Sequence, residues 1–330
     1  ASGQAAEFLT ATALANAGDN LVSASALYGG THTMFSTTLG RLGVEARFVD
    51  GDAPEAFAAR IDDRTRFLYT EIIGNPSGSV ADLEALAEVA GAHRLPLVVD
   101  STFATPYLCR PFEHGADIVV HSATKFIGGH GTSIGGVVVE SGRFDWGSGR
   151  FDQMTEPATG YNDLRFWENF GEYAFCTKLR AEQLRDIGAS LSPFNAFLLL
   201  QGLETLPQRM DEHVANAQAV AEFLDAHPLV SWVAYAGLAS SPYHDLARRY
   251  MSRGPGAVFT FGIEGGGAAG AAFIEGLTMI SHLANVGDAR TLVIHPGSTT
   301  HQQLPDEDLV AAGITPDMVR LSVGLEDLDD

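Results

Sequence analysis

Short apolar runs alternate with segments of helical periodicity through the first half of the chain. The runs predict strands at 20–23, 46–50, 65–73, 96–100, 117–122 and 135–140, and the last three read "PLVVD", "DIVVHS" and "GGVVVE". Such β-branched, almost continuously apolar runs suit strands that are buried on both faces of a sheet. The segments between them predict helices at 3–17, 32–42 and 79–94. This alternation predicts an α/β layer fold with a mainly parallel sheet.

The pattern changes near residue 162, where long helical periodicities take over. Helices are predicted at 163–187, 193–206 and 208–226, and further strands at 257–263 and 319–325, with helices between. We interpret "EGGGAAGAAFIEG" as a turn from strand to helix, because a glycine cluster alone is weak support for a phosphate loop. The predicted domains are a large domain at 1–160, a helical connection at 161–206 and a smaller C-terminal α+β domain at 207–330.

Composition narrows the class of protein. The 330 residues are 45% hydrophobic and 18% charged, which predicts a globular protein with a large core. The formal net charge of −21 argues against a nucleic-acid partner, since phosphate backbones are bound by clustered Lys and Arg. No apolar run reaches the length of a membrane span, so no membrane partner is expected. The two cysteines form no CxxC pair, and a reducing cytoplasm is the expected location.

Lysine usage singles out one position. Only two of the 20 basic residues are lysines, Lys125 and Lys178. Lys178 lies in a charged helical pattern and is expected to be an ordinary solvated residue. Lys125 instead follows an apolar run in "ADIVVHSATKFIGGHG", between hydroxyl residues and a glycine-rich turn. A lysine amine can form an imine with a carbonyl cofactor.

Polar residues follow several predicted strands, where parallel sheets bind ligands. Pyridoxal phosphate is a cofactor that uses such a lysine, and it needs an acidic partner at its ring nitrogen. A helix N-terminus suits its phosphate. Taken singly, these residues are also typical of caps, turns and packing. Together they predict a cofactor site made of Ser2, Gly3, Gln4, Tyr28, Asn75, Asp100, Ser122, Thr124 and Lys125.

Several segments resemble the pyridoxal-phosphate enzymes of cysteine and methionine metabolism. This family includes the cystathionine synthases and lyases, methionine γ-lyase and the homocysteine-forming sulfhydrylases. The resemblance covers essentially the whole chain and rests on "ASGQAA", "YGGT", "NPSG", "VVDSTFATPYLCRPFEHGADIVVHSATKFIGGHG" and "VRLSVGLED". The segments at 191–224 and 281–304 most resemble its O-acetylhomoserine sulfhydrylase (O-acetylhomoserine aminocarboxypropyltransferase) branch. Two positions depart from the common family pattern, since Gln4 often is Met and Phe126 often is Tyr.

The resemblance implies a role for each site residue. Lys125 would bind the cofactor and move protons between substrate carbons, and Tyr28 would stack on the ring and assist proton transfer at the leaving group. Asp100 would pair with the ring nitrogen and Asn75 with the ring hydroxyl. The phosphate would be held by the amides of Gly3 and Gln4 at the helix opened by Ser2, with Ser122 and Thr124. Arg320 and Ser298 would bind the substrate carboxylate, because the arginine fork matches a carboxylate. No metal is expected.

The implied reaction converts O-acetyl-L-homoserine and sulfide to L-homocysteine and acetate, in methionine biosynthesis. The resemblance also implies a homotetramer with active sites shared between subunits. It further implies an upstream segment, absent from the sequence given, that supplies a Tyr and an Arg to the neighbouring phosphate site.

Two alternatives stay open from the sequence, and a third is disfavoured. A cystathionine γ-synthase or a methionine or cystathionine γ-lyase would use the same residues. A non-catalytic or cofactor-free fragment is a second alternative. A dinucleotide-dependent oxidoreductase is disfavoured, because no GxGxxG follows a strand and opens a helix.

Overall fold

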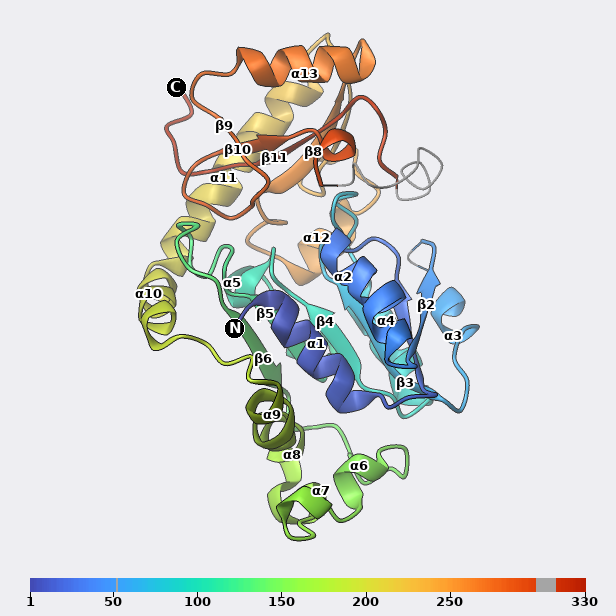
Figure 1. The fold of residues 1–330 in the computed structure, drawn as a ribbon. Helices are drawn as coiled ribbons and strands as arrows, with labels where there is room; N and C mark the ends of the chain where they lie inside the picture. The colour runs from blue at the N-terminus through green and yellow to red at the C-terminus, as the bar shows by residue number, and fades with distance from the viewer. Residues whose placement is uncertain (52, 301–312) are drawn as a thin grey trace.

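The computed structural model describes residues 1–51, 53–300 and 313–330 and contains two β-sheets (Figure 1). The larger sheet has the strand order β2-β1-β3-β4-β5-β6, in which the first five strands run parallel and β6 is antiparallel to β5. This sheet confirms the predicted α/β class. Its strands are β1 (Asn20–Ala24), β2 (Glu45–Val49), β3 (Thr65–Glu71), β4 (Leu97–Asp100), β5 (Ile118–Ser122) and β6 (Gly136–Glu140).

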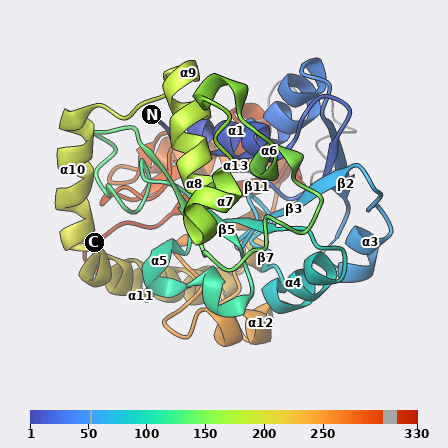
Figure 2. The same ribbon diagram turned by 90° about the horizontal axis from the view of Figure 1, so that it is seen from below.

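Helices cover both faces of the larger sheet, and α1 (Gly3–Leu14) and α4 (Leu83–Ala92) each begin where a side chain caps them. Helix α1 packs on β5 and β6, and α4 packs on β3 and β4. Figure 2 shows α1 on one side of the sheet and α4 on the other. Ser2 Oγ accepts the Ala5 N–H at 2.9 Å, and Asp82 Oδ1 accepts the Ala85 N–H at 3.2 Å. Each cap satisfies one free backbone donor of its helix.

Strand β6 differs from its prediction. Val137 and Val139 are each 39% exposed, whereas the apolar residues of β4 and β5 are buried. The reason is position, since β6 is an edge strand that pairs only with β5. Burial on both faces is therefore right for β4 and β5 and wrong for β6.

The smaller sheet has the order β7-β8-β11-β10-β9 and mixes parallel and antiparallel pairs. Strand β8 ends at Ile263 and α13 (Gly266–Gly276) follows, so the glycine-rich segment is the predicted turn from strand to helix. Helix α13 packs on β8 and β11. The strands are β7 (Val230–Ala234), β8 (Val258–Ile263), β9 (Ser281–His282), β10 (Leu292–Ile294) and β11 (Met318–Ser322).

Two long helices connect the sheets, α10 (Pro193–Glu204) and α11 (Leu206–Asp225), close to their predicted bounds (Figure 1). The helix predicted at 163–187 is instead interrupted. Gly171 has a φ of +52°, which ends α7 before the chain continues as helical turns through Ile187. These turns are α7 (Phe166–Phe170), a 3₁₀ turn (Gly171–Tyr173), α8 (Ala174–Lys178), a π-helix (Leu179–Leu184) and α9 (Arg185–Ile187).

The remaining helices are short. The helix predicted at 32–42 begins earlier, as α2, and continues into a π-helical segment. The elements are α2 (Gly29–Thr33) with a π-helix (Met34–Leu39), α3 (Pro54–Ala58), α5 (Thr105–Leu108), α6 (Asp152–Thr155) and α12 (His244–Tyr250), and the 3₁₀ turns Pro111–His114, Thr159–Tyr161 and Pro296–Ser298. None of the helices in the described ranges has the length and apolarity to cross a membrane.

Candidate active site

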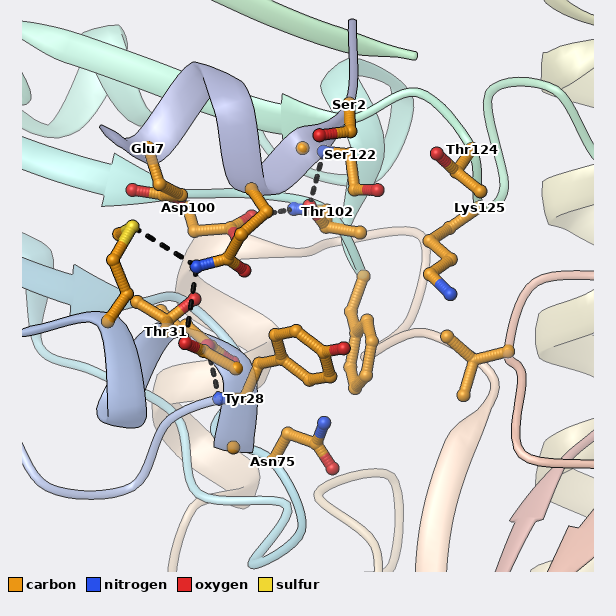
Figure 3. Close-up of a pocket in the computed structure, with 18 of the residues that line it drawn as sticks. Ser2, Glu7, Tyr28, Thr31, Asn75, Asp100, Thr102, Ser122, Thr124 and Lys125 are labelled. Atoms are coloured by element: carbon orange, nitrogen blue, oxygen red, sulfur yellow. Dashed lines mark hydrogen bonds between the residues drawn. The ribbon is translucent and has the colours of Figure 1, made fainter. Parts of the chain in front are cut away.

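A cavity of about 1030 Å³ lies where β3, β4 and β5 end, and residues near β9 and on β11 complete its wall. Parallel sheets bind ligands at this edge. All but one of the predicted site residues line it (Figure 3). They are Ser2, Gly3, Gln4, Tyr28, Asn75, Asp100, Ser122, Thr124, Lys125 and Arg320.

The amine of Lys125 reaches into this cavity from the turn after β5. Its Nζ donates to Oδ1 of Asn285 at 2.5 Å. Burial lowers the Lys125 pKa to about 8, and the nearby Arg320 cation contributes to the same shift. A larger share of this amine is therefore neutral near pH 8 than for a solvated lysine, as a nucleophilic lysine requires.

The segment that carries Asn285 comes unusually close to the lysine turn. A Cβ on Gly287 would lie 2.6 Å from the Phe126 backbone nitrogen, and Gly287 has a φ of +73°. Only glycine meets both conditions without strain. The close approach is what lets Asn285 reach the lysine amine.

Three carboxyl groups lie on the opposite side of the cavity, of which Glu7 and Glu71 are buried and Asp100 is half-buried. Asp100 ends β4, and Glu71, its register partner, ends β3. The Thr102 N–H donates to Asp100 Oδ1 at 2.7 Å, and the Tyr28 N–H donates to Glu71 Oε1 at 2.6 Å. Burial is the largest cause of the raised pKa of each group, including the third, Glu7.

Among the described residues, no positively charged side chain pairs with these three carboxyl groups. None of the ion pairs within residues 1–51, 53–300 and 313–330 includes Glu7, Glu71 or Asp100. Buried carboxylates are stable when a positive charge or several donors face them. The protonated ring nitrogen of the expected cofactor would supply that charge, so these residues fit the cofactor.

The N-terminus of α1 forms the wall of the cavity that is suited to bind an anion. A Cβ on Gly3 would lie 2.5 Å from Ser122 Cβ, so the start of the helix touches the end of β5. The first N–H groups of a helix have no partners within it, and they attract anions. The Thr124 hydroxyl, which was predicted to bind the phosphate, already has two partners within the protein. It donates to the Gly135 carbonyl at 3.2 Å and accepts the Gly135 N–H at 3.1 Å.

Arg320 is buried in β11 at the cavity, with 6% of its surface exposed. It donates to Asn75 Oδ1 at 3.3 Å and to the Asn285 carbonyl at 3.5 Å. No carboxylate pairs with it among the described residues, and burial lowers its pKa to about 10. The alternative of a surface salt bridge is therefore excluded, and the guanidinium is available for an anionic ligand.

Ser298 is the one predicted residue that does not line this cavity. It lines a separate cavity of about 360 Å³ beside α13 and lies 2.9 Å from His295 Nδ1. The 3₁₀ turn Pro296–Ser298 directs it there. The last residues of the sequence segment that suggested it, 301–304, fall outside the described ranges.

The prediction for Lys178 is wrong. Its side chain is buried, pairs with the Glu182 carboxylate one turn later, and lies 5.0 Å from the Phe166 ring centroid. The charged residues around it in the sequence suggested a solvated helix face. The stem of a lysine can nevertheless pack on apolar surface while its amine pairs with a carboxylate. Lys178 does not line the main cavity.

Four residues of the site were missed from sequence. Asn285, Glu71, Glu7 and Thr102 all line the cavity. Thr102 carried a signal, since it follows a predicted strand, whereas Glu71 lay inside the strand predicted at 65–73 and ends β3 only in the structure. Asn285 and Glu7 carried none, because their positions depend on contacts between distant segments.

Comparisons with known proteins agree with this geometry. A family model described as "Cys/Met metabolism PLP-dependent enzyme" matches residues 1–330. A homocysteine synthase of Schizosaccharomyces pombe is 53% identical, over 100% of this chain and 77% of that protein. An O-acetyl-L-homoserine sulfhydrylase of Leptospira meyeri is 49% identical, with the same coverage. A crystal structure of a Campylobacter jejuni protein, described as an O-acetylhomoserine (thiol)-lyase with a pyridoxyl-lysine monophosphate, superposes with a TM-score of 0.96 at 38% identity, over 100% of this chain and 79% of that one.

Proposed function

Because this chain belongs to the family of pyridoxal-phosphate-dependent enzymes of cysteine and methionine metabolism, we propose that it is an O-acetylhomoserine sulfhydrylase. The reaction joins O-acetyl-L-homoserine and sulfide to give L-homocysteine and acetate. The Cγ–O bond breaks and a Cγ–S bond forms, without net oxidation. The names of the relatives support the substrate, and the buried Arg320 without a carboxylate partner supports an amino-acid ligand in this cavity.

The residues that hold the cofactor follow from the cavity walls. Lys125 is proposed to bind it covalently and Asp100 to pair with its ring nitrogen. The phosphate is assigned to the α1 N-terminus at Gly3 and Gln4, with Ser122. When bound, pyridoxal phosphate supplies an electron sink for negative charge that develops on an amino acid linked to it. Tyr28 is proposed to stack on its ring and Asn75 to bond its hydroxyl.

Proton movement is assigned to Lys125 and Tyr28. A base works best when its pKa lies near the working pH, and burial brings Lys125 to about 8. Its amine is proposed to accept the Cα proton of the substrate and later to return a proton. Figure 3 shows Tyr28 and Lys125 extending into the same space, which supports a role for the Tyr28 hydroxyl at the departing acetate.

The substrate carboxylate is proposed to bind Arg320, and Asn285 is added here as its neighbour. Arg320 already contacts the Asn285 carbonyl, so one rigid unit would orient the amino acid. Ser298 keeps its proposed role only if the segment after β10 rearranges, since it lies in the separate cavity. A carboxylate held by a bidentate arginine fixes which hydrogen faces the base.

An exposed apolar stripe supports assembly. Phe194, Phe197, Leu200 and Leu203 recur along α10 and are exposed. Large exposed patches of this kind mark interfaces. We assign this stripe, which we call the α10 stripe, to contact with a second copy in a homotetramer with shared sites, in the cytoplasm. Phe197→Glu should reduce the assembly size in analytical ultracentrifugation, while Asn195→Glu on the same helix should not.

The proposed domain boundaries, 160 and 206, are consistent with the two sheets but remain a proposal. The strands of the larger sheet end at Glu140, and those of the smaller sheet begin at Val230. Limited proteolysis that cuts within 161–206 would support them.

The experiment that tests the function is a comparison of nucleophiles. Purified protein with pyridoxal phosphate and O-acetyl-L-homoserine is supplied with sulfide or with cysteine, and homocysteine and cystathionine are quantified. The proposal predicts a higher kcat/KM with sulfide. Preference for cysteine would make the chain a cystathionine γ-synthase, and release of 2-oxobutyrate without added thiol would make it a γ-lyase.

A further inference from the structure

Glu7 lies beneath the cavity, one helical turn below the start of α1. It is four residues after Gly3, so both residues share the α1 face that meets the sheet. Its surface is 3% exposed, and it borders the cavity next to Asp100. Figure 3 shows Glu7 behind Asp100 as seen from Lys125. A carboxyl group here touches no bulk water and needs partners within the protein.

Glu7 has two such partners. On one side, the hydroxyl of Tyr69, a fully buried residue of β3, donates to Glu7 Oε1 at 2.8 Å. Burial and the neighbouring carboxyl groups raise the pKa of Tyr69, so this hydroxyl keeps its proton and remains a donor. On the other side, Glu7 lies within hydrogen-bonding reach of Asp100. Two carboxyl groups in contact must share at least one proton.

The hydrogen-bond network indicates which of the two carries it. The Asp100 carboxylate accepts the Thr102 N–H at 2.7 Å, and hydrogen bonding by Thr102 acts to lower the Asp100 pKa against the effect of burial. The Thr102 hydroxyl in turn accepts the Ser122 N–H at 2.8 Å, which holds Thr102 in place. A backbone donor therefore stabilises the charge on Asp100, whereas Glu7 accepts only the Tyr69 hydroxyl and is more deeply buried. The proton belongs on Glu7.

We infer that Glu7 is a positioning residue that stays neutral and donates a hydrogen bond to Asp100, while Tyr69 holds Glu7 from behind. The chain Tyr69–Glu7–Asp100 then aims one fixed negative charge into the cavity. Of the other charged groups near Glu7, Glu71 faces it from β3 and Asp100 from β4. An ionised Glu7 would place a further negative charge beside Asp100, which the lack of a cation paired with these groups in the described ion pairs disfavours.

This inference rests on the proposed cofactor site, and its test separates the two. Glu7→Gln is the matched variant, because a glutamine amide can donate to Asp100 and accept from Tyr69 just as a neutral glutamic acid does. Glu7→Leu has a side chain of similar size but can neither donate to Asp100 nor accept from Tyr69. Pyridoxal phosphate is titrated into each ligand-free protein, and the dissociation constant and the pH dependence of the bound-cofactor absorbance are measured.

The expected result is that Glu7→Gln stays within about threefold of the parent protein and keeps its pH profile. Glu7→Leu should weaken binding about tenfold or more, as expected for loss of a hydrogen bond to a charged group. Thermal unfolding reports whether each variant folds. If Glu7→Gln shifts the pH profile, Glu7 is ionised and the inference is wrong. If Glu7→Gln and Glu7→Leu have equal affinities, the hydrogen bond to Asp100 does not position it and the inference is equally wrong. If the parent protein binds no cofactor, the proposed function fails instead.

Discussion

The amine of Lys125 is hydrogen-bonded to Oδ1 of Asn285 at 2.5 Å, although 160 positions separate these residues in the chain. Lys125 follows the larger sheet, and Asn285 lies between two strands of the smaller one. The reactive amine is therefore oriented by a segment from the other sheet. Because Arg320 also contacts Asn285, this one residue joins the lysine to the proposed carboxylate site.

The pH dependence of cofactor capture follows from the Lys125 pKa. Burial lowers it from 10.5 to about 8, so half of the amine is neutral near pH 8, and the neutral fraction rises with pH and levels off about one unit above this midpoint. The rate at which ligand-free protein captures pyridoxal phosphate should follow this curve in stopped-flow absorbance. Below the midpoint, the rate should rise about tenfold per pH unit.

Asn285→Asp provides the variant for this measurement. A carboxylate beside the ammonium favours the charged amine, so the midpoint should move above 8. Asn169→Asp, at an exposed residue of α7 that does not line the cavity, is the control and should leave the midpoint unchanged. A midpoint near 10.5 in the parent protein would show that Lys125 is solvated and would contradict the structure.

Asp100→Ala should leave the fold largely intact and lower turnover by a factor on the order of 10² or more, the usual cost of removing one fixed electrostatic group. Without the carboxylate, the ring nitrogen loses the partner that keeps it protonated. Steady-state assays with sulfide measure the effect. Asp211→Ala, which removes an exposed carboxylate bonded to Tyr107, is the control. Near-normal rates for Asp100→Ala would rule out its role.

Arg320→Lys should raise KM for O-acetyl-L-homoserine about 10- to 100-fold, because a lysine keeps the charge and loses the bidentate fork. The KM for sulfide should change little. Arg253→Lys serves as a surface control, since Arg253 only contacts Tyr107 among the described bonds. An unchanged KM for the amino-acid substrate would place its carboxylate elsewhere.

Gly3→Ala should weaken cofactor binding. The added methyl group would lie 2.5 Å from Ser122 Cβ, so the α1 N-terminus must move away from the end of β5. Overpacking of this kind costs about 1–3 kcal/mol. Gly40→Ala, where no atom lies within 4 Å of the new methyl group, is the control. Equal cofactor affinities for the two variants would show that the α1 N-terminus does not bind the phosphate.

The sequence predicted those parts of the site that depend on strand ends. Asp100 and Lys125 follow buried apolar runs, and the carboxyl ends of neighbouring parallel strands meet at one edge, so their proximity could be inferred. Residues whose positions depend on long-range packing could not be predicted from the sequence. Asn285 reaches Lys125 only because Gly287 lets two loops touch, and the pairing of Glu7 with Tyr69 depends on how α1 lies on the sheet.

The fold shows the same division. Burial of β4 and β5 on both faces was predicted correctly, because almost every residue in these two runs is apolar. The edge position of β6 was not, because an apolar run does not tell which strand lacks a second neighbour. Lys178 was misjudged for a related reason, since the Phe166 ring reaches it only through the turn at Gly171, although its ion pair with Glu182 is local.

Borohydride reduction of the protein loaded with pyridoxal phosphate, followed by peptide mass mapping, tests the central claim most directly. The chain has only two lysines; Lys178 is buried and Lys125 is half-buried, and only Lys125 lines the cavity. The account predicts a single pyridoxyl label on the peptide that contains Lys125. A label on Lys178, or no label on a protein that has bound the cofactor, would contradict it.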